Sequence, residues 1–217
     1  MDSKSIVVIG NGRIARTIAT FPQVLGYVTV DDLTSVKDPN GDEFICKVDK
    51  NMHLGVIGIG KTIYKEIRSK EWEDLGYKLG VLIHPTAFVD SRAHLGEGSV
   101  VWPLSYIDDE CFIGRCSTIG PQTGIRGAKV GDYCHLTMQN RILPGSCLED
   151  LVFLGAGATI LEKIKIGRGS VIAANSTVIK DVPERVFYYE EKIGKTKMIP
   201  EGIYYPLTER EKLEREV

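Results

Sequence analysis

The stretch VVWPLSYIDDECFIGRCSTIG, residues 100–120, returns an aliphatic side chain at every sixth position. The same step of six, counted from Ile83, reaches Ile, Leu or Val each time as far as Ile125. A period of six fits neither the 3.6-residue period of an amphipathic helix nor the two-residue alternation of a strand. It is typical of a solenoid in which each hexad forms one face of a triangular coil. The sequence therefore predicts a hexapeptide-repeat β-helix over residues 83–178.

The repeat has one irregularity, a step of five residues from Ile125 to Val130. The seventeen aliphatic positions are Ile83, Val89, Leu95, Val101, Ile107, Ile113, Ile119, Ile125, Val130, Leu136, Ile142, Leu148, Leu154, Ile160, Ile166, Ile172 and Val178. A strict solenoid is expected to change a corner where a functional site gains from it; the alternative is a neutral deletion in a surface turn. His135 follows one short face later, so we expect it to protrude beside the same groove.

Composition excludes several classes of protein. The 217 residues are 43% hydrophobic, and 27 Lys and Arg nearly balance 29 Asp and Glu, so nucleic acid and anionic lipid are not expected partners. The chain shows no signal-peptide pattern and no apolar run long enough to span a bilayer, which predicts a cytoplasmic protein. The five cysteines and four histidines lack the spacing of a disulfide framework or a metal site, so we expect no metal.

Other elements flank the repeat. Buried strands are expected at residues 5–10, 27–30 and 53–57, with helical stretches after the first and third, and a last strand at residues 78–83. We therefore predict an α/β plus β-solenoid protein with a Rossmann-like βαβ domain at residues 1–80, a parallel β-helix at residues 81–182 and a tail at residues 183–217. The tail, which ends in an expected helix at residues 208–216, should cap the solenoid or wrap a neighbour.

A glycine motif follows the first expected strand. Gly10-x-Gly12-x-x-Ala15 is suited to cradle a pyrophosphate at a helix N-terminus, and Asp31 or Asp32, about 20 residues later, would meet a ribose or base. A mononucleotide is the expected ligand, because about 80 residues hold only half of a dinucleotide-binding fold. The alternative is a tight strand-to-helix turn without a ligand.

A second glycine-rich segment follows the third expected strand. Lys61, beside Gly58 and Gly60, is placed to add a phosphate contact, and the alternative is a solvated surface lysine. The chain contains no Gly-x-Ser-x-Gly elbow and no convincing nucleophilic Cys. Direct transfer without a covalent enzyme intermediate is therefore the simpler chemistry.

These parts, taken in order with the Ile83-His-Pro-Thr-Ala entrance and the segment Phe153-Leu-Gly-Ala-Gly-Ala-Thr159, resemble the nucleotide-sugar N-acetyltransferases related to the bacillosamine and sialic acid acetyltransferases. The resemblance covers residues 4 to about 187. It implies a left-handed coil, a UDP-linked 4-amino-4,6-dideoxy sugar bound to the first domain, and acetyl-CoA held in the groove between the solenoids of a homotrimer. It places the protein in carbohydrate biosynthesis.

The resemblance also assigns residues. Those expected to bind the nucleotide sugar are Gly10, Asn11, Gly12 and Arg13 at the pyrophosphate, Asp31 and Asp32 at the uridine, and Gly58, Gly60 and Lys61 at the same nucleotide. Those expected to approach acetyl-CoA are His135, Gly155, Ala156, Ala173 and Ala174, with Lys180 at a CoA phosphate.

The chain departs from the family at the catalytic base. Where relatives carry a His in a Glu/Asp-His-Asp/Glu-Cys segment, this chain reads Ile125-Arg-Gly-Ala128, with Arg126 at the base position. An Arg side chain cannot accept a proton at neutral pH. The family's short Gly-x-Pro-Ala-Lys ending is also missing.

The sequence therefore predicts acetyl-CoA-dependent N-acetylation of a nucleotide-linked amino sugar, with His135 as general base and Arg126 holding a sugar hydroxyl or a phosphate. Two alternatives remain. One is a sugar O-acetyltransferase on the same scaffold, and the other is a nucleotide-sugar-binding homologue that has lost the chemistry.

Overall fold

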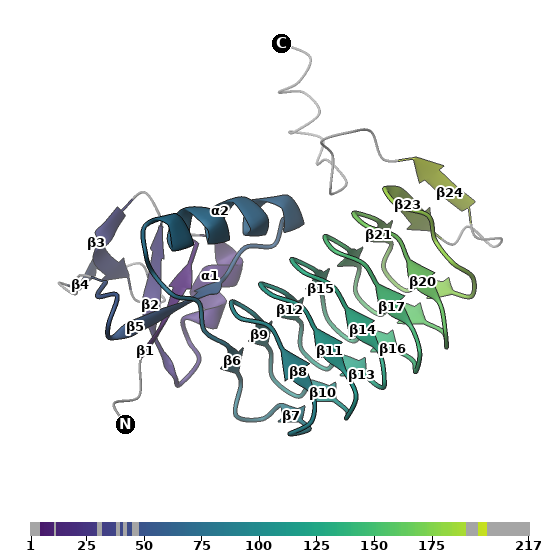
Figure 1. Cartoon of the computed structure of the whole chain (residues 1–217), viewed down its shortest axis with the longest axis horizontal. Coiled ribbons are helices and arrows are strands. Elements are labelled where there is room, and N and C mark those ends of the chain that lie inside the picture. Colours follow the sequence, from purple (N-terminus) through teal and green to yellow (C-terminus); the bar gives the residue numbers. More distant parts are fainter. Residues whose placement is uncertain are drawn as a thin grey trace, which may run out of the picture.

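A computed structural model describes residues 5–10, 12–29, 32–37, 40, 43–44, 48–189 and 195–198 of the chain. A small sheet with two helices is followed by a long stack of very short strands (Figure 1). The predicted combination of an α/β unit and a β-solenoid is confirmed. Among the described residues, no helix is long and apolar enough to cross a membrane.

The N-terminal sheet has the order β4-β3-β2-β1-β5. Its strands are β1 (Ser5–Ile9), β2 (Val24–Thr29), β3 (Asp32–Lys37), β4 (Glu43–Phe44) and β5 (His53–Ile57). The central strand β1 pairs in parallel with both β2 and β5, while β3 and β4 are antiparallel additions at one edge. Four consecutive apolar residues of β1 are buried, as expected for a parallel strand covered on both faces. The three strands predicted in this region are confirmed.

Two helices cover opposite faces of this sheet. They are α1 (Arg13–Ile18) and α2 (Thr62–Asp74). Ala15 of α1 packs in a cluster with Val8, whereas Trp72 of α2 packs in another cluster with Val7 and Ile9. Because successive side chains of a strand point to opposite faces, these clusters lie on the two sides of β1.

The solenoid consists of seventeen strands of two residues each, β6 to β22. They are β6 (Leu82–Ile83), β7 (Phe88–Val89), β8 (His94–Leu95), β9 (Val100–Val101), β10 (Tyr106–Ile107), β11 (Phe112–Ile113), β12 (Thr118–Ile119), β13 (Gly124–Ile125), β14 (Lys129–Val130), β15 (His135–Leu136), β16 (Arg141–Ile142), β17 (Cys147–Leu148), β18 (Phe153–Leu154), β19 (Thr159–Ile160), β20 (Lys165–Ile166), β21 (Val171–Ile172) and β22 (Thr177–Val178). The second residue of each strand is the predicted aliphatic residue, and all seventeen belong to one core cluster or pack against it. The hexapeptide prediction is therefore confirmed at every position.

The strands stack into three faces. The eight-stranded face runs β24-β23-β21-β18-β15-β12-β9-β6, the six-stranded face β22-β19-β16-β13-β10-β7, and the five-stranded face β20-β17-β14-β11-β8. The chain visits them in the order eight, six, five, and all pairings between coils are parallel. At the corners, neighbouring coils approach closely: a Cβ atom at Gly120 would collide with the main chain of Thr137.

The predicted irregularity is a shortened corner. Three residues separate β13 from β14, whereas four separate β10 from β11 and β16 from β17 on the coils below and above. Strand pairing is unaffected, since Ile113 and Val130 remain partners across this step. The deletion thus shortens only the turn between the six- and five-stranded faces.

The ends of the solenoid differ from the sequence expectation in detail. Instead of one strand over residues 78–83, Leu79 forms a single bridge to Gly55 beside β5, and β6 already belongs to the solenoid. At the other end, β23 (Val186–Tyr189) joins β21 in parallel and β24 (Lys195–Met198) pairs with β23 antiparallel. Tyr188 is buried and packs in the core of the solenoid. This part of the tail caps the last coil; the helix predicted at residues 208–216 lies outside the described residues.

The N-terminal unit packs directly on the solenoid. Trp72 and Leu79 share a buried cluster with Cys116, Tyr133 and Leu151, which lie at the corner between the five- and eight-stranded faces. In Figure 1, α2 lies above the N-terminal sheet, and its end reaches over the upper edge of the first coils. The expected domain boundary near residue 81 stays a prediction.

Candidate active site

Two glycine loops meet at the carboxyl ends of β1 and β5. The Gly58 N–H donates a hydrogen bond to the Ile9 carbonyl oxygen at 3.0 Å, and a Cβ atom at Gly10 would lie 3.1 Å from the Gly58 carbonyl oxygen. Gly10 has a φ of +138°, which favours glycine. The structure therefore brings together the two segments that the sequence singled out separately.

This meeting point is a topological switch point. The chain leaves β1 towards one side of the sheet through α1 and leaves β5 towards the other through α2, because the two helices cover opposite faces. Ligands of open α/β sheets bind in the crevice that such divergence creates. Thr62, the first residue of α2, has a buried hydroxyl with no hydrogen-bond partner among the described residues. An unpaired buried donor here fits a ligand that supplies the missing acceptor.

The predicted nucleotide residues fall around this crevice. Gly12 and Arg13 are exposed at the start of α1, and a Cβ atom at Gly12 would meet nothing within 4 Å. Lys61 is exposed at the start of α2, with its ammonium 5.9 Å from the centre of the Tyr64 ring. The backbone of Asp32 pairs with Thr29 at the carboxyl end of β2. Asn11 and Asp31 lie outside the described residues.

His135 lies on the outward side of β15, on the eight-stranded face. Its ring stacks on Phe153 of the next coil, with 5.5 Å between ring centroids and 12° between planes. The side chain is only 7% exposed, and Nδ1 is buried without a hydrogen-bond partner among the described residues. Burial, and secondarily the charge of Lys65, holds the pKa of His135 well below its usual range. The imidazole is therefore neutral and able to accept a proton, although a lower pKa makes it a weaker base.

The surroundings of His135 differ from the expectation. We predicted that it would protrude beside the groove at the shortened corner, but that corner joins the six- and five-stranded faces. His135 lies one face further along the coil and is shielded. The physical reason is α2, which places Lys65 over this part of the eight-stranded face.

Lys65 was not foreseen from the sequence. It is fully buried, and its Nζ donates hydrogen bonds to Thr118 Oγ1 at 2.8 Å and to the carbonyl oxygen of Cys134 at 2.7 Å. Burial lowers the pKa of this amine to about 7, an effect that the thiols of Cys134 and Cys116 partly oppose. The available signal was spacing, because Lys65 lies seven residues before Trp72 and so on the same side of the helix.

Four of the predicted acetyl-CoA residues form one corner, between the eight- and six-stranded faces. Gly155 and Ala156 stack against the equivalent residues of the next coil, Ala173 and Ala174, and a Cβ atom at Gly155 would collide with the main chain of Ala174. The N–H of Asn175 donates to the Ala156 carbonyl oxygen at 2.7 Å. Since Phe153 both precedes Gly155 by two residues and stacks on His135, this corner adjoins His135 within one protomer.

Arg126 and Lys180 lie at a different corner, between the six- and five-stranded faces. Arg126 is 65% exposed, and its Nε lies 3.3 Å from Oδ2 of Asp108 on the coil below. The pKa of Asp108 is lowered, chiefly by hydrogen bonding to Asp109 and less by Arg126. A single protomer therefore does not bring Arg126 and Lys180 together with His135.

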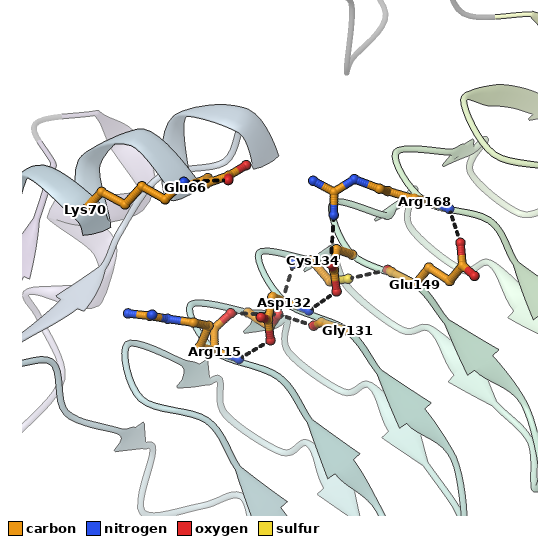
Figure 2. A network of polar contacts seen from close by, with 10 residues as sticks. Glu66, Lys70, Arg115, Gly131, Asp132, Cys134, Glu149 and Arg168 are labelled. Atoms are coloured by element: carbon orange, nitrogen blue, oxygen red, sulfur yellow. Dashed lines mark hydrogen bonds and ion pairs between the residues drawn. The ribbon is translucent and has the colours of Figure 1, made fainter.

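The third corner carries a ladder of charged groups (Figure 2). Oδ1 of Asp132 accepts the N–H of Arg115, and Oδ1 of Asp150 accepts the N–H of Asp132, both at 2.9 Å. Figure 2 shows this ladder below α2, whose Glu66 and Lys70 form their own ion pair at 2.9 Å. These carboxylates satisfy main-chain donors of the turns, which is a structural task. A hollow of about 420 Å³ beside the ladder, lined among others by Phe112, Cys147 and Arg168, contains none of the predicted site residues.

Short stretches of the chain match curated acetyltransferases. No protein-family profile matches the chain. Over 39 residues it is 59% identical to a 2,3,4,5-tetrahydropyridine-2,6-dicarboxylate N-acetyltransferase of Clostridium perfringens, a match that covers 18% of this chain and 16% of the relative. Over another 39-residue match it is 49% identical to a galactoside O-acetyltransferase of Lactococcus lactis, covering 18% of this chain and 19% of that relative. The chain thus spans less than a fifth of the length of these curated relatives.

Solved structures match nearly the whole chain. The acetyltransferase domain of PglB from Neisseria gonorrhoeae superposes with a TM-score of 0.76 at 20% identity, covering 90% of this chain and 100% of that one. PerB from Caulobacter crescentus, solved with CoA and GDP-perosamine, gives a TM-score of 0.74 at 24% identity, covering 89% and 97%. WeeI from Acinetobacter baumannii gives 0.65 at 18% identity, covering 90% and 100%. The chain therefore has the left-handed β-helix fold of the solved hexapeptide-repeat sugar acetyltransferases.

Proposed function

We propose that the protein is an acetyl-CoA-dependent N-acetyltransferase that acts on the amino group of a nucleotide-linked 4-amino-4,6-dideoxy sugar. Two observations support this choice of class. The fold matches acetyltransferases over about nine-tenths of the chain, and one of these, PerB, was solved with both CoA and an amino-sugar nucleotide. A cytoplasmic location stays a prediction.

The nucleotide half of the acceptor would occupy the crevice between the two glycine loops. Main-chain N–H groups near Gly12, Gly58 and Gly60, together with Arg13 and Lys61, suit a pyrophosphate. By the sequence resemblance, Asn11 would join them at the pyrophosphate, and Asp31 and Asp32 would face the uridine. UDP is the nucleotide implied by the sequence resemblance, and the GDP-sugar bound to PerB makes GDP the first alternative to test.

The observation that carries the chemistry is the buried Nδ1 of His135, which has no hydrogen-bond partner in the part of the chain that the structure describes. A buried polar atom without a hydrogen bond costs about 1–3 kcal/mol, so a native structure retains one where it serves a purpose. His135 is neutral and adjoins the glycine and alanine corner at Gly155 and Ala174. On two successive coils that corner carries Gly155, Ala156, Ala173 and Ala174, whose side chains are small.

In the proposed reaction, the neutral sugar amine attacks the carbonyl carbon of the acetyl thioester. His135 takes the proton that the nitrogen loses as its bond to carbon forms, and a main-chain N–H near Gly155 stabilises the oxyanion. The tetrahedral intermediate then collapses by breaking the carbon–sulfur bond. His135 returns its proton to the leaving sulfur, so CoA departs as the thiol. The products are the N-acetylated sugar and CoA.

A complete groove would need two protomers. His135 and the Gly155 corner lie on one side of the coil, whereas Arg126 and Lys180 lie at a corner on the other side. In a homotrimer, the Arg126 corner of one protomer would face the His135 side of its neighbour, with Lys180 at a CoA phosphate and Arg126 at a sugar hydroxyl or phosphate. A monomer in solution contradicts this arrangement.

A second candidate function is binding of the nucleotide sugar without turnover. It is favoured by the ion pair of Arg126 with Asp108 at the shortened corner, because a paired cation replaces the base that relatives carry there. Acetylation of a sugar hydroxyl is the remaining possibility on this scaffold, and it would require a stronger base than a shielded imidazole.

The test is release of CoA from acetyl-CoA with UDP-, GDP- and dTDP-linked amino sugars and their hydroxyl counterparts. His135→Asn is compared with His94→Asn, a matched control, because His94 occupies the same outward strand position and stacks on Phe112 at 4.5 Å. We expect turnover with an amino sugar, a loss of roughly a hundredfold or more in kcat for His135→Asn, and no loss for His94→Asn. Binding of a nucleotide sugar without any turnover would overturn the enzyme proposal and establish the binder.

A further inference from the structure

Helix α2 buries a stripe that is polar over its first turns and ends in Trp72. Its buried residues are Thr62, Lys65, Ser69 and Trp72, spaced three, four and three apart and therefore on one side of the helix. By contrast, Tyr64 and Ile67 on another side are 49% and 42% exposed. A surface helix normally buries its apolar side, so this inverted pattern requires a reason beyond helix packing.

Lys65 is the centre of that stripe. Its two acceptors flank the proposed base, since the Cys134 carbonyl immediately precedes His135 and Thr118 is the pairing partner of His135 on the neighbouring strand β12. An isolated buried ammonium is costly, and replacing it by an apolar side chain is often neutral or favourable to stability. Retention of the amine here therefore points to a role other than stability.

The same helix begins at the proposed nucleotide site. Lys61 and Thr62 stand at its first turn, and Lys65 follows one turn later. A helix is stiff over one turn, so any displacement of its N-terminus on phosphate binding would be transmitted to Lys65. Lys65, beside the proposed base, follows Lys61, the proposed phosphate contact, by only four residues.

We propose that Lys65 is a positioning residue that couples occupation of the nucleotide site to the orientation and protonation of His135. The inference rests on the proposed function, since it deepens the use of the same site. Lys65 makes no contact with substrate. It acts through its hydrogen bonds to Thr118 and Cys134, which hold β12 and β15, and through its charge.

The electrostatic surroundings support this role. Burial, and secondarily the charge of Lys65, lowers the pKa of His135, while the groups whose charge acts on Lys65 are the thiols of Cys134 and Cys116. Around the next turn of α2, Ser69 contacts Cys116 and Tyr133, and Arg115 binds Glu73 at 2.6 Å. The pair of Glu66 and Lys70 lies on the outer side of the helix. Lys65 is thus the cation that acts on His135 from α2.

The test uses Lys65→Met, which keeps the length of the side chain and removes the amine. Lys70→Met is the matched control, because Lys70 lies on the same helix, is exposed and forms an ion pair with Glu66. The first readout is the pH titration of imidazole signals in protein labelled with ¹³C at histidine, with His135 assigned by His135→Asn. We expect the pKa of His135 to rise in Lys65→Met and to stay unchanged in Lys70→Met. If Lys65→Met does not fold, Lys65→Gln serves the same purpose.

The second readout is the response to nucleotide. Addition of UDP or GDP should shift the His135 signals in wild-type protein, and Lys65→Met should abolish the shift while the nucleotide still binds. With an active acceptor, Lys65→Met should lower kcat by roughly three- to thirtyfold, the usual scale of coupling between sites, because the loss of orientation outweighs the higher basicity of His135. KM for the nucleotide sugar should be unchanged.

The outcomes separate the inference from the proposed function. If His135 titrates identically in wild type and Lys65→Met, or if neither nucleotide shifts its signals in wild type, the coupling is refuted even for an active enzyme. If the protein binds nucleotide, shows the coupling by spectroscopy and has no transferase activity, the inference holds for a binding protein and the proposed reaction is wrong.

Discussion

The Nζ atom of Lys65 donates a hydrogen bond to the carbonyl oxygen of Cys134 at 2.7 Å, across the contact between α2 and the solenoid. This bond joins the two parts of the molecule at the residue next to His135. It also places a titratable group, with a pKa of about 7, where the protein contacts no solvent. The consequence is a pH dependence of stability that can be assigned to a single side chain.

Wild-type protein should become more stable relative to Lys65→Met as the pH rises above 7. The pKa of Lys65 falls from 10.5 to about 7 on folding, so between these values the unfolded chain binds a proton that the folded chain lacks. Raising the pH therefore favours the folded state, by a slope that approaches about 1.4 kcal/mol per pH unit. Urea denaturation at pH 7.0 to 8.5 measures the difference in unfolding free energy. A difference that is constant over this range would show that Lys65 keeps its ordinary pKa.

Acid should destabilise the wild type through His135. Its pKa is lowered in the folded protein, so below pH 6.5 the unfolded chain takes up a proton first and stability falls with decreasing pH. In His135→Asn this contribution is absent, and the decline in unfolding free energy between pH 6.5 and 5 should be shallower. His94→Asn is the control, because it also removes an imidazole that stacks on a phenylalanine ring. Equal slopes in all three proteins would contradict the burial of His135.

The sequence predicted the solenoid because it depends on a local pattern. It missed the buried lysine because that burial depends on a contact between distant segments. The inward column of aliphatic residues is determined by the local period, so all seventeen strands followed from counting. The burial of Lys65 depends on how α2 docks against a face formed more than fifty residues later, as the bond to Thr118 shows. No local sequence pattern encodes a contact between residues so far apart in the chain.

The face on which His135 lies follows from the number of faces in each coil. With three faces per coil, the aliphatic positions Ile125, Val130 and Leu136 lie on three successive faces, so Arg126 and His135 cannot share a groove within one protomer. The proximity of the two glycine loops can be expected from the sequence, because parallel strands place their carboxyl ends at one edge of a sheet. That Gly10 and Gly58 touch nevertheless required the strand order β2-β1-β5, which the sequence left open.

Close stacking of the coils predicts a difference between two glycines of the same coil. In Gly120→Ala the new methyl group collides with the main chain at Thr137, whereas in Gly124→Ala it meets nothing within 4 Å. Because the main chain cannot move without distorting the ladder, Gly120→Ala should lower the free energy of unfolding by about 1–3 kcal/mol or more. Gly124→Ala should stay within about 0.5 kcal/mol of wild type. Thermal or urea denaturation compares the two, and equal stability would mean that the coils are more loosely stacked.

The corner at Arg126 offers a test of substrate contact. If Arg126 holds a hydroxyl or phosphate equally in ground and transition states, Arg126→Ala should raise KM for one substrate with kcat unchanged. Arg141→Ala is the matched control, because Arg141 is also exposed and lies on the six-stranded face one coil above. Initial rates at varied acetyl-CoA and acceptor identify which substrate is affected. An Arg126→Ala enzyme with wild-type constants would leave the ion pair with Asp108 as the only role of this residue.

Gly12 tests the nucleotide crevice, because an added methyl group there should leave stability unchanged but weaken nucleotide binding. A methyl group there meets no protein atom within 4 Å, and Gly12 does not adopt a positive φ, so Gly12→Ala should fold with wild-type stability. If a pyrophosphate approaches this backbone, the same methyl group separates it from the N–H donors, and loss of such charged hydrogen bonds should weaken binding about tenfold or more. Calorimetric titration with UDP and GDP, using Gly124→Ala as a control for an equally open glycine, measures the effect. Unchanged affinity in Gly12→Ala would place the phosphates away from the first loop and leave Gly60 and Lys61, at the start of α2, as the remaining contacts.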